Sequence, residues 1–428
     1  MDADVIVLGA GVAGLAAAAE LARAGRTVLL LEARGRIGGR VCTRHEPGVA
    51  VPLELGAEFI HGDAQLTREL LGQRGIAVAD VHGSRWRAHA GRLEPAADWL
   101  EQVTAAMQQA PILRSRDVSF DVLLDQHLPG IDAEAKQAAR RMAEGFDAAD
   151  TARASARALV AEWSGDTLGG APQSRPSGGY GALLTALLQG LTPPALQLRL
   201  HCPVRALRWS AGEVEVSGEW LGMPFAARAP RALVTLPLGV LQQQGAVRFT
   251  PELDSKQAAL ALLASGSIVK LLLRFSRPFW AQCAGQRYAD ASFFHAPEAQ
   301  FPTFWTARPE AAPLLVAWLG GPPAAQLATR GSAFLVRSAL ATLASLFRLA
   351  PEPLLEGYYL HEWDADPFAR GAYSYVLVGG ESARSQLAVP LADTLFFAGE
   401  ATDAEEAGTV NGALRTGVRA AREMLALP

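Results

Sequence analysis

An α/β fold with mixed sheets and helices is predicted by two short segments near opposite ends of this 428-residue chain. Near the start, an apolar run at 5–8 is followed by a glycine-rich turn, a helical stretch and a second apolar run at 28–31. Near the end, an apolar run at 395–397 leads through a Gly-Glu pair into another helical stretch. Strand, turn, helix and strand in this order are typical of parallel strands joined by crossover helices.

The first segment has the features of a dinucleotide-binding βαβ unit. Gly9 permits a tight turn, Gly11 lets the backbone approach a pyrophosphate, and Gly14 lets the helix pack closely on the strand. The pyrophosphate would lie on the free N–H groups at the helix N-terminus. Glu32 ends the second strand at the spacing where a carboxylate accepts hydrogen bonds from ribose hydroxyls. The segment therefore predicts a Rossmann-like unit.

The residues after Glu32 indicate which dinucleotide binds. Two arginines flank a glycine pair, so guanidinium and backbone donors are expected to converge on one pyrophosphate. A nicotinamide-dependent dehydrogenase does not need this second clamp. The block resembles the arginine-rich (GR2-type) extension of the flavin-containing amine oxidase superfamily, which includes monoamine oxidases, polyamine oxidases, lysine-specific histone demethylases and L-amino acid oxidases. The resemblance implies an FAD cofactor, held here by Ala33, Arg34, Gly38, Gly39 and Arg40.

The C-terminal segment supplies a second helix start for the same cofactor. Gly399-Glu400 ends the apolar run, and Thr409-Val410 opens the helical stretch that follows. The positive end of a helix dipole can stabilise negative charge on a reduced flavin ring. This segment resembles the C-terminal FAD motif of the superfamily, which implies that these four residues bind the cofactor.

Composition and charge exclude several classes of protein. A chain of 428 residues is long enough for two domains. The net charge of −4 argues against a nucleic-acid partner. The three cysteines, Cys42, Cys202 and Cys283, are far apart and odd in number, so we expect neither a disulfide framework nor a metal site.

We expect a soluble, cytoplasmic protein. The first apolar run begins within a few residues of Met1, which leaves no room for a signal peptide, and the chain carries no hydrophobic tail after its last helical stretch. No apolar run is long enough to span a bilayer, so no membrane association is predicted. The oligomeric state is left open.

The predicted FAD-binding domain is discontinuous. It comprises residues 1–75, 195–245 and 385–428, while residues 76–194 and 246–384 form an inserted substrate domain of mixed sheet and helices. The middle segment reads as strands, and by resemblance Val204 meets the adenine through its backbone.

Lys270 is the first candidate for chemistry. It lies inside an apolar strand, where an ammonium is costly unless it finds a partner or loses its charge. The Pro-Phe-Trp segment at 278–280 resembles the amine oxidase segment in which this lysine holds a water against flavin N5.

Tyr373 is the second candidate. The stretch 360–375 resembles the family region in which an aromatic ring stands beside the flavin, and it implies that Trp363 contributes to the cofactor site. Ala372 stands where monoamine oxidases have the cysteine that binds flavin, so the FAD is expected to be non-covalent. Thr409 stands at the position of the second cage tyrosine of those enzymes, which leaves half the aromatic cage missing.

A third cluster lies at 55–62. Gly56 and Ala57 would lie under the flavin ring with Glu58 beside them, and His61 resembles a histidine of animal polyamine oxidases. For the distal charge of a long amine, the candidate partners are Glu58, Glu144, Asp147 and Asp150, whose roles are left open.

The predicted function is FAD-dependent amine oxidation. A hydride would pass from the α-carbon of a neutral amine to flavin N5, giving an imine, then an aldehyde or ketone plus amine, and hydrogen peroxide. A polyamine or other long cationic amine is the expected substrate, with molecular oxygen or another electron acceptor as the second reactant. The alternatives are a monoamine oxidase for compact amines, an FAD-dependent desaturase or porphyrinogen-type oxidase, and a flavoprotein scaffold or binding module. The catalytic candidates are Lys270, Tyr373, His61 and Thr409.

Overall fold

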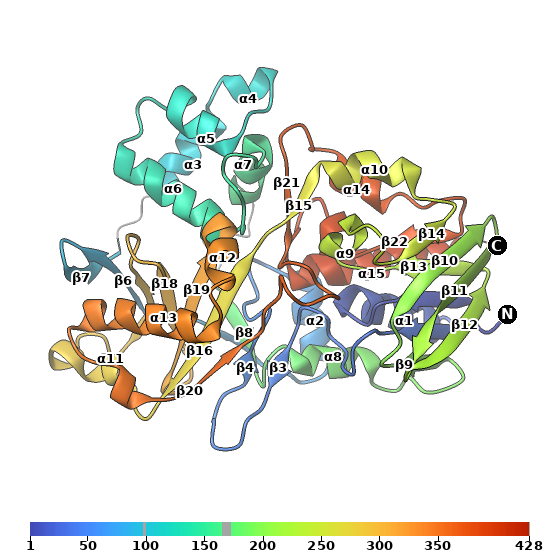
Figure 1. The fold of residues 1–428 in the computed structure, drawn as a ribbon, viewed down its shortest axis with the longest axis horizontal. Helices are drawn as coiled ribbons and strands as arrows, with labels where there is room; N and C mark the ends of the chain where they lie inside the picture. The colour runs from blue at the N-terminus through green and yellow to red at the C-terminus, as the bar shows by residue number, and fades with distance from the viewer. Residues whose placement is uncertain (97–99, 165–172, 428) are drawn as a thin grey trace.

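The computed structural model describes residues 1–96, 100–164 and 173–427, which fold into two lobes (Figure 1). Both chain termini lie in the lobe built on a parallel sheet, the parallel-sheet lobe, and the other lobe is built on a larger mixed sheet, the mixed-sheet lobe. Within these residues, no helix is both long and apolar enough to cross a membrane.

Five parallel strands form the central sheet of the parallel-sheet lobe. In spatial order they are β22 (Leu395–Phe397), β13 (Arg231–Val234), β1 (Val5–Leu8), β2 (Val28–Leu31) and β9 (Leu196–Arg199). All five strands are short, and β22, β13, β1 and β2 are mostly apolar and buried, as expected for a parallel sheet covered on both faces, whereas β9 at the edge alternates apolar and polar residues. Their carboxyl ends therefore share one edge of the sheet.

The two faces of this sheet pack against different layers. Val5 and Val7 of β1 face a helical layer, whereas Ile6 and Leu8 face a second sheet. The helices are α1 (Val12–Arg23), α2 (Gln65–Gln73), α8 (Gly181–Leu188) and α15 (Val410–Leu425). The second sheet has the order β12 (Met223–Ala229), β11 (Glu213–Trp220), β10 (Val204–Ser210) and β14 (Arg248–Thr250).

A seven-stranded sheet forms the mixed-sheet lobe. Its order is β20 (Leu355–Leu360), β16 (Ile268–Phe275), β19 (Leu314–Gly320), β18 (Thr303–Thr306), β17 (Ala291–His295), β6 (Ser84–His89) and β7 (Arg92–Pro95). Only β17 and β6 pair in parallel. One face packs on α11 (Phe279–Gln282), α12 (Gly321–Ala328) and α13 (Ser332–Phe347), with η2 (Cys283–Gln286) alongside.

A helical cluster stands beside this sheet (Figure 1). It contains α3 (Leu100–Gln108), α4 (Ile112–Ser115), α5 (Phe120–Val122), the π-helix η1 (Leu123–His127), α6 (Ala133–Gly145) and α7 (Ala156–Ser164). The remaining elements are β3 (Thr43–Arg44), β4 (Leu53–Glu54), β5 (Val78–Asp80), β8 (Ser174–Pro176), α9 (Leu238–Gln242), α10 (Asp254–Ala261), β15 (Leu263–Ser265), η3 (Glu352–Leu354), β21 (Ser374–Val376), α14 (Ala383–Ala388) and η4 (Glu400–Thr402).

The predicted α/β class with a discontinuous nucleotide-binding sheet is confirmed. The five parallel strands come from the three segments expected to form the FAD-binding domain, and β6 and β7 of the first insert join the sheet of the second insert. Two elements differ from the expected division, because α8 packs on α1 and α2, and β14 pairs with β10. Both lie just inside the inserts as the sequence divides them.

Close packing of α1 against α15 holds the first and last helices together. A Cβ added at Gly417 of α15 would lie 2.2 Å from the backbone oxygen of Ala13 in α1. A Cβ at Gly14 would lie 1.9 Å from the backbone oxygen of Gly9. Glycine at these two positions is therefore a packing requirement.

Gly417→Ala is expected to lower the free energy of unfolding by about 1–3 kcal/mol, because α15 must move away from α1 to make room for the methyl group. Thermal unfolding of the apoprotein measures this effect. Gly72→Ala is the matched control, because a Cβ at this exposed position of α2 meets no atom within 4 Å. It should be neutral or stabilise by up to about 1 kcal/mol. Equal melting temperatures for the two variants would contradict the packing argument.

Candidate active site

One cavity of about 1590 Å³ lies between the lobes and is lined by residues of both. This volume exceeds the roughly 300–1,000 Å³ of a typical single-ligand pocket, so it has room for a cofactor and a substrate together. The sequence-predicted site residues that line it are Gly9, Gly11, Glu32, Ala33, Arg34, Gly38, Gly39, Arg40, Gly56, Ala57, Glu58, His61, Val204, Lys270, Trp363, Tyr373, Gly399, Glu400, Thr409 and Val410. Gly14 does not line the cavity, in keeping with its packing role.

The first glycine turn leaves open space where a phosphate would bind. Gly9 has a φ of +102°, and a Cβ added at Gly11 would meet no atom within 4 Å. Both oxygens of Glu32 accept backbone N–H groups, from Ala10 and from Arg34, each at 2.9 Å. Glu32 therefore fixes the turn, and each carboxylate oxygen keeps a lone pair for a ribose hydroxyl.

Two of the three arginines that closely follow Glu32, Arg34 and Arg40, have different partners. Arg40 donates to the carboxylate of Glu400 at 2.8 Å and also to the backbone oxygen of Ala372. Arg34 instead forms a two-point contact with Asp366, at 2.7 and 3.3 Å. Both arginines line the cavity, and Arg34 is held there by a carboxylate that follows β20, so the expected convergence of the two guanidinium groups on one pyrophosphate stays a prediction.

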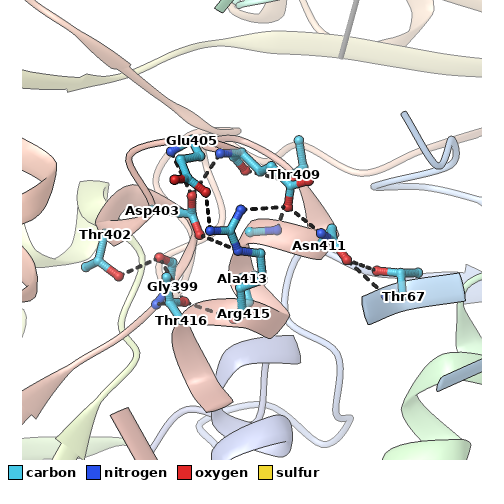
Figure 2. A network of polar contacts seen from close by, with 12 residues as sticks. Thr67, Gly399, Thr402, Asp403, Glu405, Thr409, Asn411, Ala413, Arg415 and Thr416 are labelled. Carbon is cyan, nitrogen blue, oxygen red and sulfur yellow. Dashed lines mark hydrogen bonds and ion pairs between the residues drawn. The ribbon is translucent and has the colours of Figure 1, made fainter. Parts of the chain in front are cut away.

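A polar network fixes the start of α15 (Figure 2). Thr409 is the N-cap of this helix, and its hydroxyl accepts the N–H of Gly412 at 2.9 Å. Asn411 accepts from the backbone and side chain of Thr67 in α2, while Arg415 pairs with three carboxylates of the preceding loop. The Thr409 hydroxyl, expected at the substrate, is thus engaged by its own helix, although the residue lines the cavity.

Lys270 lies on β16, where the two lobes meet, and its side chain is only 1% exposed. Its ammonium donates to the backbone oxygen of Gly56 at 2.8 Å and lies 2.6 Å from Oε2 of Glu58. The ring of Trp305 lies 5.7 Å from the same nitrogen. Lys270 therefore carries a paired charge at the cavity wall.

Glu58 is shared between Lys270 and a second cation. Its Oε1 accepts from Arg175 at 2.7 and 3.1 Å and from the indole of Trp305 at 3.0 Å. Burial opposes ionisation of this carboxyl, but Lys270 and Arg175 outweigh burial and hold the pKa of Glu58 below its usual range. Glu58 is consequently unavailable to a distal substrate ammonium.

Tyr373 and His61 lie on an aromatic part of the wall. The Tyr373 hydroxyl donates to the backbone oxygen of Phe146 at 2.7 Å, and burial raises the pKa of this phenol. The ring of His61 meets the ring of Phe146 edge to face at 5.2 Å. Burial lowers the pKa of His61 to about 4, so it is neutral at physiological pH. The two rings offer shape and apolar surface rather than charge.

The remaining acidic candidates differ in availability. Glu144 lines the cavity but pairs with Arg141 at 3.2 Å. The carboxylate of Asp150 binds the N–H of Ala152 and is not part of the lining. Asp147 is buried and accepts from the indole of Trp163 at 3.0 Å.

Sequence reasoning missed Arg175, Trp305 and Glu162. Glu162 lines the cavity and faces Asp147, and burial raises the pKa of both carboxyls. Arg175 and Trp305 reach Glu58 from segments more than a hundred residues away in the chain. A partner at that separation leaves no local sequence signal.

Comparison with known proteins identifies a family. Residues 12–425 match the model of a family described as flavin containing amine oxidoreductase. Human lysine-specific histone demethylase 2 is 29% identical over 460 residues, covering 99% of this chain and 53% of the relative. Polyamine oxidase 4 of Oryza sativa subsp. japonica is 28% identical over 450 residues, covering 98% of this chain and 88% of the relative. The chain thus spans about half the length of the histone demethylase.

Solved structures share the fold at lower identity. Cyclohexylamine oxidase from Brevibacterium oxydans superposes with a TM-score of 0.83 and 21% identity, covering 99% of both chains. Wild-type putrescine oxidase bound to putrescine gives a TM-score of 0.81 and 22% identity, again covering 99% of both chains. The open space at Gly11 and a similar one at Gly399 fit the flavin cofactor of the matched family.

Gly11→Ala tests the cofactor cradle. The backbone at Gly11, with φ −73° and ψ −179°, suits any residue, so the free energy of unfolding of the apoprotein should change by about 0.5 kcal/mol or less. The added methyl group would occupy the space expected for the pyrophosphate. Flavin content per chain, read from the absorbance of the purified protein, should therefore fall sharply. Full flavin content would show that the cofactor does not approach this turn.

Ala372 generates a prediction about cofactor attachment. Its methyl side chain provides no nucleophile, and it is buried beside the cavity. Acid precipitation of the holoprotein should therefore give a colourless pellet and a yellow supernatant containing FAD. A flavin that stays with the denatured chain would show a covalent bond.

Proposed function

Because the chain belongs to the family of flavin containing amine oxidoreductases, we propose that it is an FAD-dependent amine oxidase whose substrate is a polyamine or another long cationic amine. The observation that carries this proposal is that one cavity contains both a dinucleotide cradle, formed by the turn at Gly9–Gly11, and an aromatic chamber, lined by His61, Phe146 and Tyr373. Lys270 lies where the cradle and the chamber meet. Neither part alone would distinguish an oxidase from another dinucleotide-binding protein.

Bound FAD would supply the acceptor for a hydride from the α-carbon of a neutral amine, and oxygen, with release of hydrogen peroxide, or another acceptor would take up the electrons. The chain supplies position and environment. Tyr373, His61 and Phe146 provide an apolar wall that orients the amine. Lys270 would hold a water at the junction through its remaining N–H. Because the chamber favours the neutral amine, turnover is expected to rise with pH through the pKa of the bound amine.

Glu162 and Asp147 support the proposal that the substrate carries a second positive charge, away from its reacting amine. The two carboxyls face each other near Tyr373, and each raises the electrostatic cost of ionising that phenol. Burial raises the pKa of both carboxyls, and a second ammonium would favour ionisation of Glu162, which lines the cavity, whereas Asp147 lies outside the lining. The two residues are therefore the strongest remaining candidates for a distal cation.

A second candidate is an amine that carries a distal carboxylate. Arg85, Arg87 and Arg141 also line the cavity. Arg87 and Arg141 pair with Glu134 and Glu144, but in the part of the chain that the structure describes Arg85 has no carboxylate partner and stacks on Phe293 at 5.4 Å. An anionic group at the far end of the substrate would satisfy it.

Three amines of equal length separate these candidates: hexylamine, 1,6-diaminohexane and 6-aminohexanoate, with spermidine and benzylamine beside them. The measurement is kcat/KM at low and high salt, together with anaerobic bleaching of the flavin. We expect 1,6-diaminohexane and spermidine to exceed hexylamine and benzylamine by about tenfold at low salt, which corresponds to roughly 1.4 kcal/mol. Salt should reduce the preference, since it screens charges across a cavity open to solvent.

The other outcomes each select a different function. Preference for 6-aminohexanoate would support the second candidate, and preference for benzylamine or hexylamine at low salt would indicate a monoamine oxidase for compact amines. If no amine bleaches the flavin, the amine oxidase proposal fails and an FAD-dependent desaturase replaces it.

A further inference from the structure

The ammonium of Lys270 stands in surroundings that disfavour a charge. It lies between Val269 and Leu271 in the middle of β16, and both neighbours are buried. Its cross-strand neighbour on β19 is Trp318, which carries no charge. An ammonium in such a place loses its proton readily unless a carboxylate compensates. Lys270 therefore depends on its partners to stay charged.

Among the described residues, two carboxyls act on this ammonium. Glu58 makes direct contact at 2.6 Å. The charge of Lys270 favours the ionised form of Glu54, although the two side chains are not in contact. The Glu54 carboxylate accepts hydrogen bonds from the Thr43 hydroxyl and from the N–H of Tyr180. Arg175, the nearest other cation, lies behind Glu58 and binds its second oxygen. Glu58 is thus the group that compensates Lys270 directly.

Glu58 is itself held in one orientation. Three N–H groups, two from Arg175 and one from Trp305, fix its Oε1. Arg175 is anchored in turn by the backbone oxygens of Thr306 and Arg308, and its guanidinium lies 4.6 Å from the ring of Phe59. This clamp leaves Oε2 facing Lys270.

The clamp on Glu58 leaves part of the hydrogen-bonding capacity of Lys270 unused by the protein. An ammonium has three N–H bonds, and Lys270 donates one to the backbone oxygen of Gly56 while its nitrogen forms an ion pair with Oε2 of Glu58 at 2.6 Å. Lys270 also lines the cavity, so its third N–H is available there. Two fixed acceptors on the protein side determine where the third bond points.

We propose that Glu58 is a positioning residue, which keeps Lys270 charged and aims its one free N–H into the cavity where the cofactor and the amine meet. The inference rests on the proposed function, because it gives Lys270 a task toward the flavin. It extends that function by assigning a role to a carboxylate that sequence reasoning had placed with the cofactor or with a distal ammonium.

The test compares Glu58→Gln, Lys270→Met and the double variant. The first readout is the thermal stability of the apoprotein from pH 7 to 10, which requires neither flavin nor substrate. In Glu58→Gln the buried ammonium has no counter-charge in direct contact, so it should shed its proton in the folded state at a pH where the unfolded chain retains it. The unfolded state then binds more protons, and stability rises with pH. The deficit against the native protein should therefore be largest near pH 7 and shrink by at least half by pH 10.

Controls separate this effect from simple loss of packing. The double variant lacks the ammonium, so its deficit should not change with pH. Glu54→Gln removes a buried carboxyl that does not contact Lys270. The pKa of Glu54 is raised by burial to about 7, so above pH 8 its replacement should give a constant offset. A deficit in Glu58→Gln that stays constant from pH 7 to 10 would overturn the proposal.

The second readout is the rate of anaerobic flavin reduction by the best amine of the panel. Glu58→Gln should slow it about ten- to a hundredfold at pH 7, since the charge-assisted contact that holds Lys270 in place is lost. The double variant should be no slower than Lys270→Met, because Glu58 acts through the lysine. Multiplicative losses in the double variant would refute that route.

Two further outcomes are covered by the design. If Glu58→Gln does not fold, Glu58→Asp and Glu58→Asn provide a pair of equal length that differs only in charge, and only the asparagine variant should show the shrinking deficit. If no amine reduces the flavin of the native protein, the proposed function fails. The stability measurement still decides whether Glu58 keeps Lys270 charged.

Discussion

The ion pair between Arg40 and Glu400 is the interaction on which the geometry of the cavity depends. It joins loops separated by 360 residues, and the same guanidinium binds the backbone oxygen of Ala372. The second oxygen of Glu400 accepts from the Ser374 hydroxyl at 2.7 Å. Burial opposes ionisation of Glu400, but Arg40 and Arg384 outweigh it and hold its pKa below the usual range. Three distant parts of the chain are thereby set around one cavity by a charge that stays ionised.

The nucleotide-binding half of the fold could be predicted because its requirements are local. Gly9, Gly11 and Glu32 act within one βαβ unit, where the turn, the helix start and the strand end are fixed by neighbours in sequence. The second helix start, at Thr409, is also determined by residues close together in the sequence, because Thr409 caps its own helix. The parallel sheet then follows, because apolar strands of four residues must be covered on both faces. The position of α8 and β14 was misjudged because their sequences show amphipathic or apolar character without showing which layer covers them.

The chamber could be predicted only in part, because its residues are defined by partners far away in the chain. The sequence indicates that Lys270 is a lysine whose charge is unfavourable to bury in an apolar strand. It does not reveal that Glu58 faces this lysine or that Arg175 holds Glu58. Arg34 likewise has a partner that its local sequence does not reveal, a carboxylate 332 residues further on. Each of these contacts depends on how the mixed-sheet lobe packs against the parallel-sheet lobe. Motif spacing therefore locates the cofactor cradle better than it locates the groups that face a substrate.

The charges around the chamber are matched in a way that suits a neutral reactant. Lys270 and Arg175 share Glu58, and Arg141 is paired with Glu144. Such pairs keep their charges without a bound ligand, because each charge is compensated within the protein. Asp147 and Glu162 are the exception, since burial raises the pKa of both carboxyls and favours retention of protons. In the part of the chain that the structure describes, several charges on the cavity wall are therefore held in pairs, and Arg85 and Glu162 are among the wall groups that form no ion pair, so a ligand charge would act most directly on such groups.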